Sequence, residues 1–209
     1  MARGFVIALL GAESTGKTTL ARELGAALAT PQHTVAVVAE YLREFCDRHG
    51  RTPRRDEQAG IAAEQTLRIA TAAQAHDVVV ADTSALMIAV YSDHVFGDTG
   101  LYIDALAAHA RCDLTLLTAL DLPWQADGLQ RDGPQVREPV DARVRRALSG
   151  AGLPFAVVSG RNGTRLANAL AAARRALAPA APPDPQPRWH GVCERCGDAA
   201  CERHLLPRA

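Results

Sequence analysis

Short apolar runs recur along the chain, and longer stretches with helical periodicity separate them. The runs are Phe5–Leu10, Thr34–Val38, Asp77–Ala81, Leu114–Leu120 and Pro154–Ser159. Nearly continuous apolar segments of this length are typical of strands that are buried on both faces of a parallel sheet. We therefore expect five parallel strands.

The intervals between these runs carry the spacing of amphipathic helices. We expect helices over Lys17–Ala29, Asp56–Gln74, Ser84–Phe96, Leu101–Ala110, Asp141–Leu148 and Thr164–Leu177. Strands that alternate with helices are joined by right-handed crossovers, which place helices on both faces of the sheet. The pattern predicts an α/β fold with a doubly wound, five-stranded parallel sheet.

A proline-rich segment then interrupts the pattern. Residues 179–187 read PAAPPDPQP, and five prolines in this stretch can neither continue a helix nor pair within a sheet. We therefore expect one main domain over residues 1–178, a semi-rigid linker over 179–188 and a small tail over 189–209.

Composition narrows the range of partners. The formal net charge of the 209 residues is zero and no polybasic block occurs, so neither nucleic acid nor an anionic membrane is indicated as a partner. The longest apolar stretches are too short to span a bilayer. The apolar N-terminus runs directly into a glycine-rich motif, so we interpret it as a strand instead of a signal peptide and expect a cytoplasmic protein.

That motif is GAESTGKTT, residues 11–19, which fits the phosphate-binding pattern G-x-x-x-x-G-K-[ST] between a strand and a helix. Glycines let successive backbone N–H groups point inward at phosphate oxygens. Lys17 would reach the β- and γ-phosphates of ATP, and the Thr18 hydroxyl would bind Mg²⁺. The expected nucleotide-binding residues are Gly11, Glu13, Ser14, Thr15, Gly16, Lys17, Thr18 and Thr19. The fold class is accordingly that of a P-loop NTPase.

Basic-residue usage supports a function for this loop. Of the 23 basic residues, 22 are arginine and Lys17 is the only lysine. A compact ammonium on a flexible stem suits a phosphate loop, where a planar guanidinium would not fit.

Asp82 directly follows the third apolar run, at the sheet edge that faces the ligand crevice in open α/β folds. Its carboxylate would hold Mg²⁺ or accept a proton from the attacking hydroxyl. The alternative is an N-cap for the next helix, a role that Thr83 or Ser84 could also fill.

Two further segments bear candidate acceptor-binding residues. In AEYLREF, residues 39–45, Glu40 could bind a sugar hydroxyl or act as its base, and Arg43 could hold a phosphate or orient that carboxylate. An amphipathic turn with Tyr41 and Phe45 in the core accounts for the same segment equally well.

The second segment, Leu122–Glu138, contains Arg131 and Arg137 and has the glycines of a mobile lid. Such a lid would exclude water and stabilise transition-state charge, and Trp124 at its start could stack on an aromatic ring. An ordinary polar loop with a buried tryptophan is the alternative.

Taken together and in this order, GAESTGKTT, EYLREF, the Asp82–Thr83 pair and PWQADGL resemble the nicotinamide riboside kinase domain of the bifunctional NadR proteins. More broadly, the chain is similar to the NadR-like P-loop ATPases and kinases over about Arg3–Leu177. The resemblance implies MgATP-dependent phosphorylation of the 5′-hydroxyl of nicotinamide riboside to give nicotinamide mononucleotide.

Carried onto this chain, the resemblance assigns Lys17 and Thr18 to ATP and Mg²⁺. It places Glu40, Arg43 and Asp82 on the acceptor and metal side, Trp124 and Asp127 near the nucleoside, and makes Arg131 the lid arginine. Tyr41 stands with Glu40 and Arg43 as a substrate residue, and Lys17, Glu40, Asp82 and Arg131 form the expected catalytic set.

The chain also departs from the family pattern. The lid reads DGLQR where the family often has DGLR, and Ser84 replaces a second acid after Asp82. The adenylyltransferase signature that precedes the kinase domain of NadR is not found before the first strand. These departures leave open a different nucleoside or small alcohol as acceptor.

The tail carries the spacing of a metal site. Cys193-x₂-Cys196-x₄-Cys201-x₂-His204 provides two ligand pairs of the kind that bind structural Zn²⁺. The alternative is free thiols in a disordered end. Two functions therefore remain at this point: a nucleoside kinase, or a nucleotide-dependent switch whose zinc-bound tail contacts a protein partner or a second copy of the chain.

Overall fold

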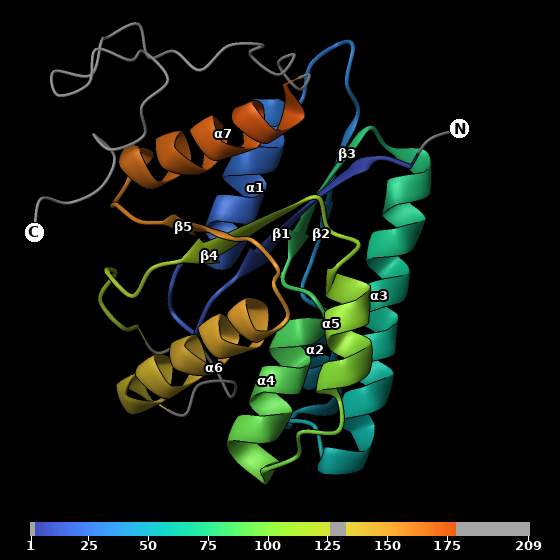
Figure 1. Cartoon of the computed structure of the whole chain (residues 1–209), viewed down its shortest axis with the longest axis vertical. Helices are drawn as coiled ribbons and strands as arrows, with labels where there is room; N and C mark the ends of the chain where they lie inside the picture. Colours follow the sequence, from blue (N-terminus) through green and yellow to red (C-terminus); the bar gives the residue numbers. More distant parts are fainter. Residues whose placement is uncertain (1–2, 126–132, 179–209) are drawn as a thin grey trace, which may run out of the picture. The chain divides into compact units, whose positions relative to one another are not determined.

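The computed structural model describes residues 3–125 and 133–178, and Figure 1 shows their arrangement. These residues belong to one compact unit, Met1–Ala178. Its sheet has five strands in the order β2-β3-β1-β4-β5, and every pair is parallel. The strands are β1 Phe5–Leu10, β2 Val35–Val38, β3 Val78–Asp82, β4 Leu114–Thr118 and β5 Ala156–Val158. The predicted five-stranded parallel sheet is confirmed.

Helices connect the strands throughout the described residues. They are α1 Lys17–Leu28, α2 Tyr41–His49, α3 Gln58–Ala75, α4 Ala85–Phe96, α5 Tyr102–His109, α6 Arg137–Gly150 and α7 Gly163–Leu177, with short 3₁₀ turns at Arg55–Glu57 and Pro134–Val136. Two of them differ from the sequence expectation. The segment after β2 is a full helix that Gly50 ends at φ 65°, and α6 starts four residues early because the turn at Pro134 leads directly into it.

Helices cover both faces of the sheet, as the doubly wound prediction requires (Figure 1). On one face, Ile7 and Leu9 of β1 pack with apolar residues of α1 and α7. On the other face, Leu10 packs with residues of α4 and α6. Alternate residues of β1 thus enter opposite cores, because side chains alternate along a strand. No helix in the described part of the chain is long and apolar enough to cross a membrane.

A close approach between α1 and β2 depends on one glycine. A Cβ placed on Gly25 would lie 2.4 Å from Cγ2 of Val37, so α1 can approach the strand only where a side chain is missing. Gly60 in α3 offers the contrast, since a Cβ there would have no neighbour within 4 Å.

A buried polar relay fixes the turn between β3 and α4. The hydroxyl of Ser84 lies 2.9 Å from Nδ1 of His109, and Nε2 of His109 lies 2.9 Å from the hydroxyl of Thr115. Ser84 also caps α4 by accepting a hydrogen bond from the Leu86 amide. Burial lowers the pKa of His109 to about 4, so the ring is neutral and can donate from one nitrogen while it accepts at the other.

The glycine pair gives a matched test of the packing. We expect Gly25→Ala to destabilise the fold by about 1–3 kcal/mol, because Val37 or the helix must move. Gly60→Ala should instead stabilise it by about 0.5 kcal/mol, because alanine favours the helix. Urea unfolding of both variants checks this, and equal effects of the two substitutions would contradict the packing argument.

The His109 relay predicts a pH dependence of stability. The unfolded chain takes up a proton near pH 6.5 and the folded chain only near pH 4. The contribution of neutral His109 to the free energy of unfolding is therefore fully present above pH 6.5 and is lost as the pH falls to about 4. The loss should be on the order of 3 kcal/mol.

Unfolding free energies measured across this range for the wild type and for His109→Gln test the prediction. The variant should be less stable at neutral pH, but its unfolding free energy should fall less than that of the wild type between pH 6.5 and pH 4. An identical pH profile in the two proteins would show that His109 does not titrate as described.

Candidate active site

The glycine-rich loop between β1 and α1 has the backbone that the motif predicts. Gly11 has φ 146° and Gly16 has φ 77°, and a Cβ on Gly11 would lie 2.0 Å from the Thr118 hydroxyl. Neither position therefore accepts a side chain without strain or collision. Lys17 folds across the loop, and its ammonium donates hydrogen bonds of 2.9 Å to the carbonyl oxygens of Gly11 and Ala12.

Threonines beneath the loop hold its shape. The Thr15 hydroxyl donates to the Ala12 carbonyl at 2.8 Å, and the Thr118 hydroxyl, at the end of β4, lies 2.7 Å from the Thr15 hydroxyl. These groups are fully buried, so the loop is supported by satisfied polar contacts.

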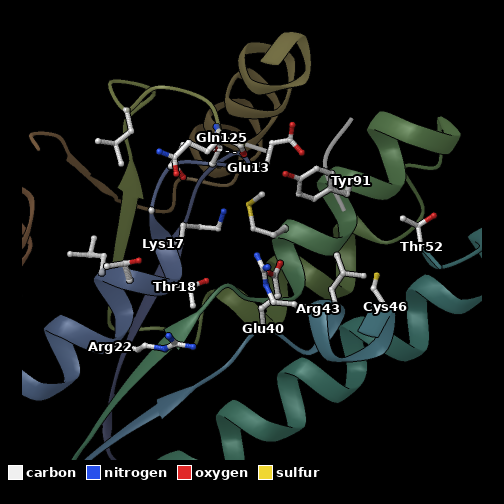
Figure 2. Close-up of a pocket in the computed structure, with 18 of the residues that line it drawn as sticks. Glu13, Lys17, Thr18, Arg22, Glu40, Arg43, Cys46, Thr52, Tyr91 and Gln125 are labelled. Atoms are coloured by element: carbon white, nitrogen blue, oxygen red, sulfur yellow. Dashed lines mark hydrogen bonds and ion pairs between the residues drawn. The ribbon is translucent and has the colours of Figure 1, made fainter. Parts of the chain in front are cut away.

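A cavity of about 1270 Å³ opens beside the loop, and Figure 2 shows part of its wall. The walls come from the start of α1, the start of α2, residues 52–55, α4, the segment after β4 and the start of α7. Nine of the predicted site residues line it: Glu13, Ser14, Thr15, Gly16, Lys17, Thr18, Thr19, Glu40 and Arg43.

The cavity wall carries an excess of positive charge. Lys17 is joined there by six arginines, Arg22, Arg43, Arg54, Arg55, Arg161 and Arg165, against three glutamates, Glu13, Glu23 and Glu40. Arg55 and Arg165 are paired with carboxylates outside the lining, Asp98 and Asp121. The remaining five cations still outnumber the three carboxylates, which favours an anionic ligand. Most of these arginines lie outside recognisable motifs, and sequence reasoning missed them. The adjacent pair at positions 54 and 55 was the one local signal.

The helix α2 divides the EYLREF residues between the core and the cavity. Glu40 and Arg43 line the cavity, with Nε of Arg43 3.9 Å from Oε2 of Glu40. Phe45 is buried against Ile61 and Ile88, and the Arg68 guanidinium lies 4.3 Å from the ring centroid of Tyr41. Glu40 and Arg43 thus have the position of binding residues, whereas Phe45 has the core position of the alternative interpretation. Tyr41 is not among the lining residues.

Asp82 is buried at the end of β3, opposite Leu9 of β1, the strand that leads into the phosphate loop. It is not among the lining residues, and its Oδ1 has no hydrogen-bond partner within residues 3–125 and 133–178. Ser84 provides the cap of α4, so the N-cap alternative does not account for Asp82. A buried carboxylate oxygen without a partner is costly, and the position fits a role in holding a cation or its water.

A buried glutamine connects the loops that carry the two acidic residues. Gln65 of α3 accepts a hydrogen bond from the Tyr41 amide at 2.7 Å through Oε1. Its Nε2 donates longer bonds to the carbonyls of Ala39 and Thr83, at 3.4 and 3.5 Å. The neighbours of Glu40 and Asp82 are thus held by one side chain.

The segment after β4 lies against the phosphate loop. The Trp124 indole donates to Oε1 of Glu13 at 3.3 Å, and the Gln125 amide donates to the Ser14 hydroxyl at 2.7 Å. Leu122 approaches Gly16, where a Cβ would meet its Cδ1 at 3.1 Å. Trp124 is not among the lining residues, although its neighbours Pro123 and Gln125 are, so its contact with a nucleoside stays a prediction.

Other predicted residues lie outside the described ranges. They are Asp127, Arg131, Cys193, Cys196, Cys201 and His204, together with the linker and the tail. Within residues 3–125 and 133–178 no group of three or more His, Cys, Asp or Glu side chains could hold a metal ion. The zinc site therefore stays a prediction.

Solved structures share this fold at low sequence identity. NadR in complex with NR is 20% identical with a TM-score of 0.68, and NadR in complex with NAD and AMP-PNP is 21% identical with a TM-score of 0.64. Each match covers 82% of this chain and about half of the NadR chain, 50% and 49% respectively. The chain thus spans about half the length of these relatives.

A third structure, thymidylate kinase from Ehrlichia chaffeensis, is 15% identical with a TM-score of 0.56, and the match covers 77% of this chain and 89% of that one. A search of curated proteins finds no match. The sequence profile of the AAA domain family matches residues 6–165, which include the phosphate loop, Glu40 and Asp82. Because this match extends over most of the chain, the protein belongs to the AAA domain family of P-loop proteins, and its structure is similar to that of NadR.

Proposed function

We propose that this protein is a P-loop kinase that transfers the γ-phosphate of ATP to a hydroxyl of a nucleoside-like small molecule, with nicotinamide riboside as the first acceptor to test. The observation that carries the proposal is the shared cavity. The phosphate loop opens into the same space of about 1270 Å³ as Glu40 and Arg43. Single-ligand pockets commonly occupy about 300–1,000 Å³, so this one has room for a donor and an acceptor.

The donor side would work by positioning and charge neutralisation. Lys17 already lies over the loop carbonyls, within reach of phosphates bound there, and the surrounding arginines supply further positive charge. Thr18 lines the cavity and Asp82 lies buried next to the end of β1, so these two would hold Mg²⁺. When bound, Mg²⁺ would neutralise charge on the β- and γ-phosphate oxygens.

The acceptor side would be formed by α2 and α4. The Glu40 carboxylate is the candidate that orients the attacking hydroxyl and takes its proton. Arg43, whose Nε lies 3.9 Å from Oε2 of Glu40, would form an ion pair with it. Tyr91 and Met87 of α4 line the same cavity and offer an apolar surface for a ring. Figure 2 labels Tyr91 in the cavity wall. The Trp124 indole donates to Glu13, and Tyr91, which lines the cavity, is a second candidate ring contact.

The similar solved structures support a nucleotide-dependent phosphotransfer. One NadR structure contains NR, another contains NAD and AMP-PNP, and the third neighbour is a thymidylate kinase. Because each is less than a quarter identical to this chain, they establish the fold, and the acceptor has to be tested directly.

The proposal predicts acceptor-dependent turnover. Purified protein with ATP and Mg²⁺ should release ADP rapidly only when nicotinamide riboside or another nucleoside is present, and the nucleoside should gain one phosphate. Lys17→Ala should lower this rate by about a thousandfold, because one charge on the transferred group is no longer stabilised. Mass spectrometry of the products and an ADP assay measure both effects.

Two results would contradict the kinase. Slow ATP hydrolysis that no acceptor accelerates would favour the nucleotide-dependent switch. Full turnover by Lys17→Ala would remove the phosphate-loop assignment itself.

Substitutions of Glu40 and Asp82 should change different kinetic parameters. Glu40→Gln should lower kcat by about a hundredfold with little change in the KM for ATP, since it removes a base. Asp82→Asn should raise the Mg²⁺ concentration needed for half-maximal rate. Asp104 has an exposed carboxylate on α5, so Asp104→Asn serves as the control. It should change neither kcat nor the Mg²⁺ requirement. Equal effects of Glu40→Gln and Asp82→Asn on the Mg²⁺ requirement would refute the division of roles.

A further inference from the structure

We propose that Arg165 is a positioning residue for the phosphate donor. It would act by holding the phosphate loop, the segment after β4 and the loop after β5 in one geometry. The proposal rests on the proposed binding of ATP at the phosphate loop, and it does not depend on which acceptor is used.

Arg165 is buried, with 5% of its surface exposed, although it belongs to the first turn of α7. One Nη1 contact reaches the carbonyl oxygen of Thr15, in the phosphate loop, at 3.2 Å. Nε donates to the Gly160 carbonyl at 2.9 Å, and Nη1 also lies 3.4 Å from the Val158 carbonyl at the end of β5. One guanidinium thus contacts two loops that are far apart in the sequence.

The third loop is reached through Asp121, which lies just after β4. Nη2 of Arg165 donates to Oδ1 of Asp121, and Oδ2 of Asp121 accepts a hydrogen bond from the Gly160 amide at 2.6 Å. Burial raises the pKa of Asp121, but the Gly160 amide and the Arg165 charge outweigh it and leave the pKa below its ordinary value. The carboxylate is therefore ionised at neutral pH, and the network is an ion pair between a buried guanidinium and a half-buried carboxylate, with added hydrogen bonds.

The contact with Thr15 bears directly on phosphate binding. In a trans peptide the C=O and the following N–H point in opposite directions, and no cis peptide occurs in the described chain. Holding the Thr15 carbonyl toward Arg165 therefore fixes the direction of the Gly16 N–H, one of the amides expected to bind phosphate oxygens. Preorganised amides of this kind bind an anion without paying for reorientation at the moment of binding.

The contact with Asp121 extends the effect to the segment that lies on the loop. Four residues further along, the Gln125 amide donates to the hydroxyl of Ser14, and Leu122 approaches Gly16. Fixing Asp121 thus fixes the start of a segment that contacts the phosphate loop at two more places. Without Arg165, both the loop and this segment would gain freedom that nucleotide binding must remove.

The test separates a positioning role from a purely structural one. Arg165→Gln and Arg165→Lys are compared with the wild type for binding of AMP-PNP by calorimetry, for the separate KM values of ATP and nicotinamide riboside, and for urea unfolding. Arg145→Gln is the matched control, because Arg145 also pairs with a carboxylate, at 2.6 Å from Asp141, and lies on α6 away from the cavity wall.

We expect Arg165→Gln to weaken AMP-PNP binding about tenfold and to raise the KM for ATP in proportion, with the KM of the acceptor within about twofold of the wild type. Arg165→Lys should recover part of the affinity, because it keeps the charge but loses the fork of contacts. Arg145→Gln should leave nucleotide binding unchanged.

Should Arg165→Gln fail to fold, Arg165→Lys and Asp121→Asn carry the same measurement. Folded variants that bind AMP-PNP as tightly as the wild type, or that raise both KM values equally, would overturn the positioning role. Wild-type protein that binds no AMP-PNP would instead remove the proposed function on which the role rests.

Discussion

Parallel pairing of all five strands is the constraint on which the rest of the structure depends. Because the strands run the same way, their carboxyl ends meet at one edge, and the loops that follow them meet there too. The phosphate loop follows β1, Glu40 follows β2, Asp82 ends β3, and the Trp124 segment follows β4. Residues more than 100 positions apart in the chain become neighbours for this reason alone.

An edge built from loops needs internal support, since loops lack the hydrogen-bond ladder of a strand. In this protein the support comes from single buried polar side chains that bridge neighbouring loops. Thr118 supports the phosphate loop from below, Gln65 joins the loops after β2 and β3, and Arg165 joins those after β1, β4 and β5. Each one has partners for most of its polar atoms, which offsets the cost of burying it.

In the proposed kinase, the cavity at this edge would combine a donor side at the phosphate loop with an acceptor side at α2 and α4. Its excess of arginine suits phosphate groups, and the one lysine of the chain lies where a compact cation is needed. Glu40 and Arg43 line the part of the cavity proposed for the acceptor, and Met87 and Tyr91 of α4 add the apolar surface that a ring would need. Phosphotransfer between two bound small molecules requires this combination of charge and enclosure.

The sequence by itself determined the five strands, their parallel direction in an α/β fold, and the phosphate loop. These follow from local spacing: apolar runs of strand length, helical periodicity, and glycines placed around one lysine. Even the boundaries of β1 and α4 were predicted to within one residue. The helix at Tyr41–His49 was left open because a short amphipathic segment fits a turn or a helix equally well.

Only the tertiary structure decided which side chains face the cavity. It turned Tyr41 toward Arg68, set Trp124 against Glu13, and brought Arg165 within reach of Thr15, 150 residues earlier. No local pattern specifies such contacts, because they arise between loops that are joined through the sheet and not along the chain. Periodicity and motifs in the sequence identify the strands, the helices and the phosphate loop. Which polar groups become buried between these elements depends on how the elements pack.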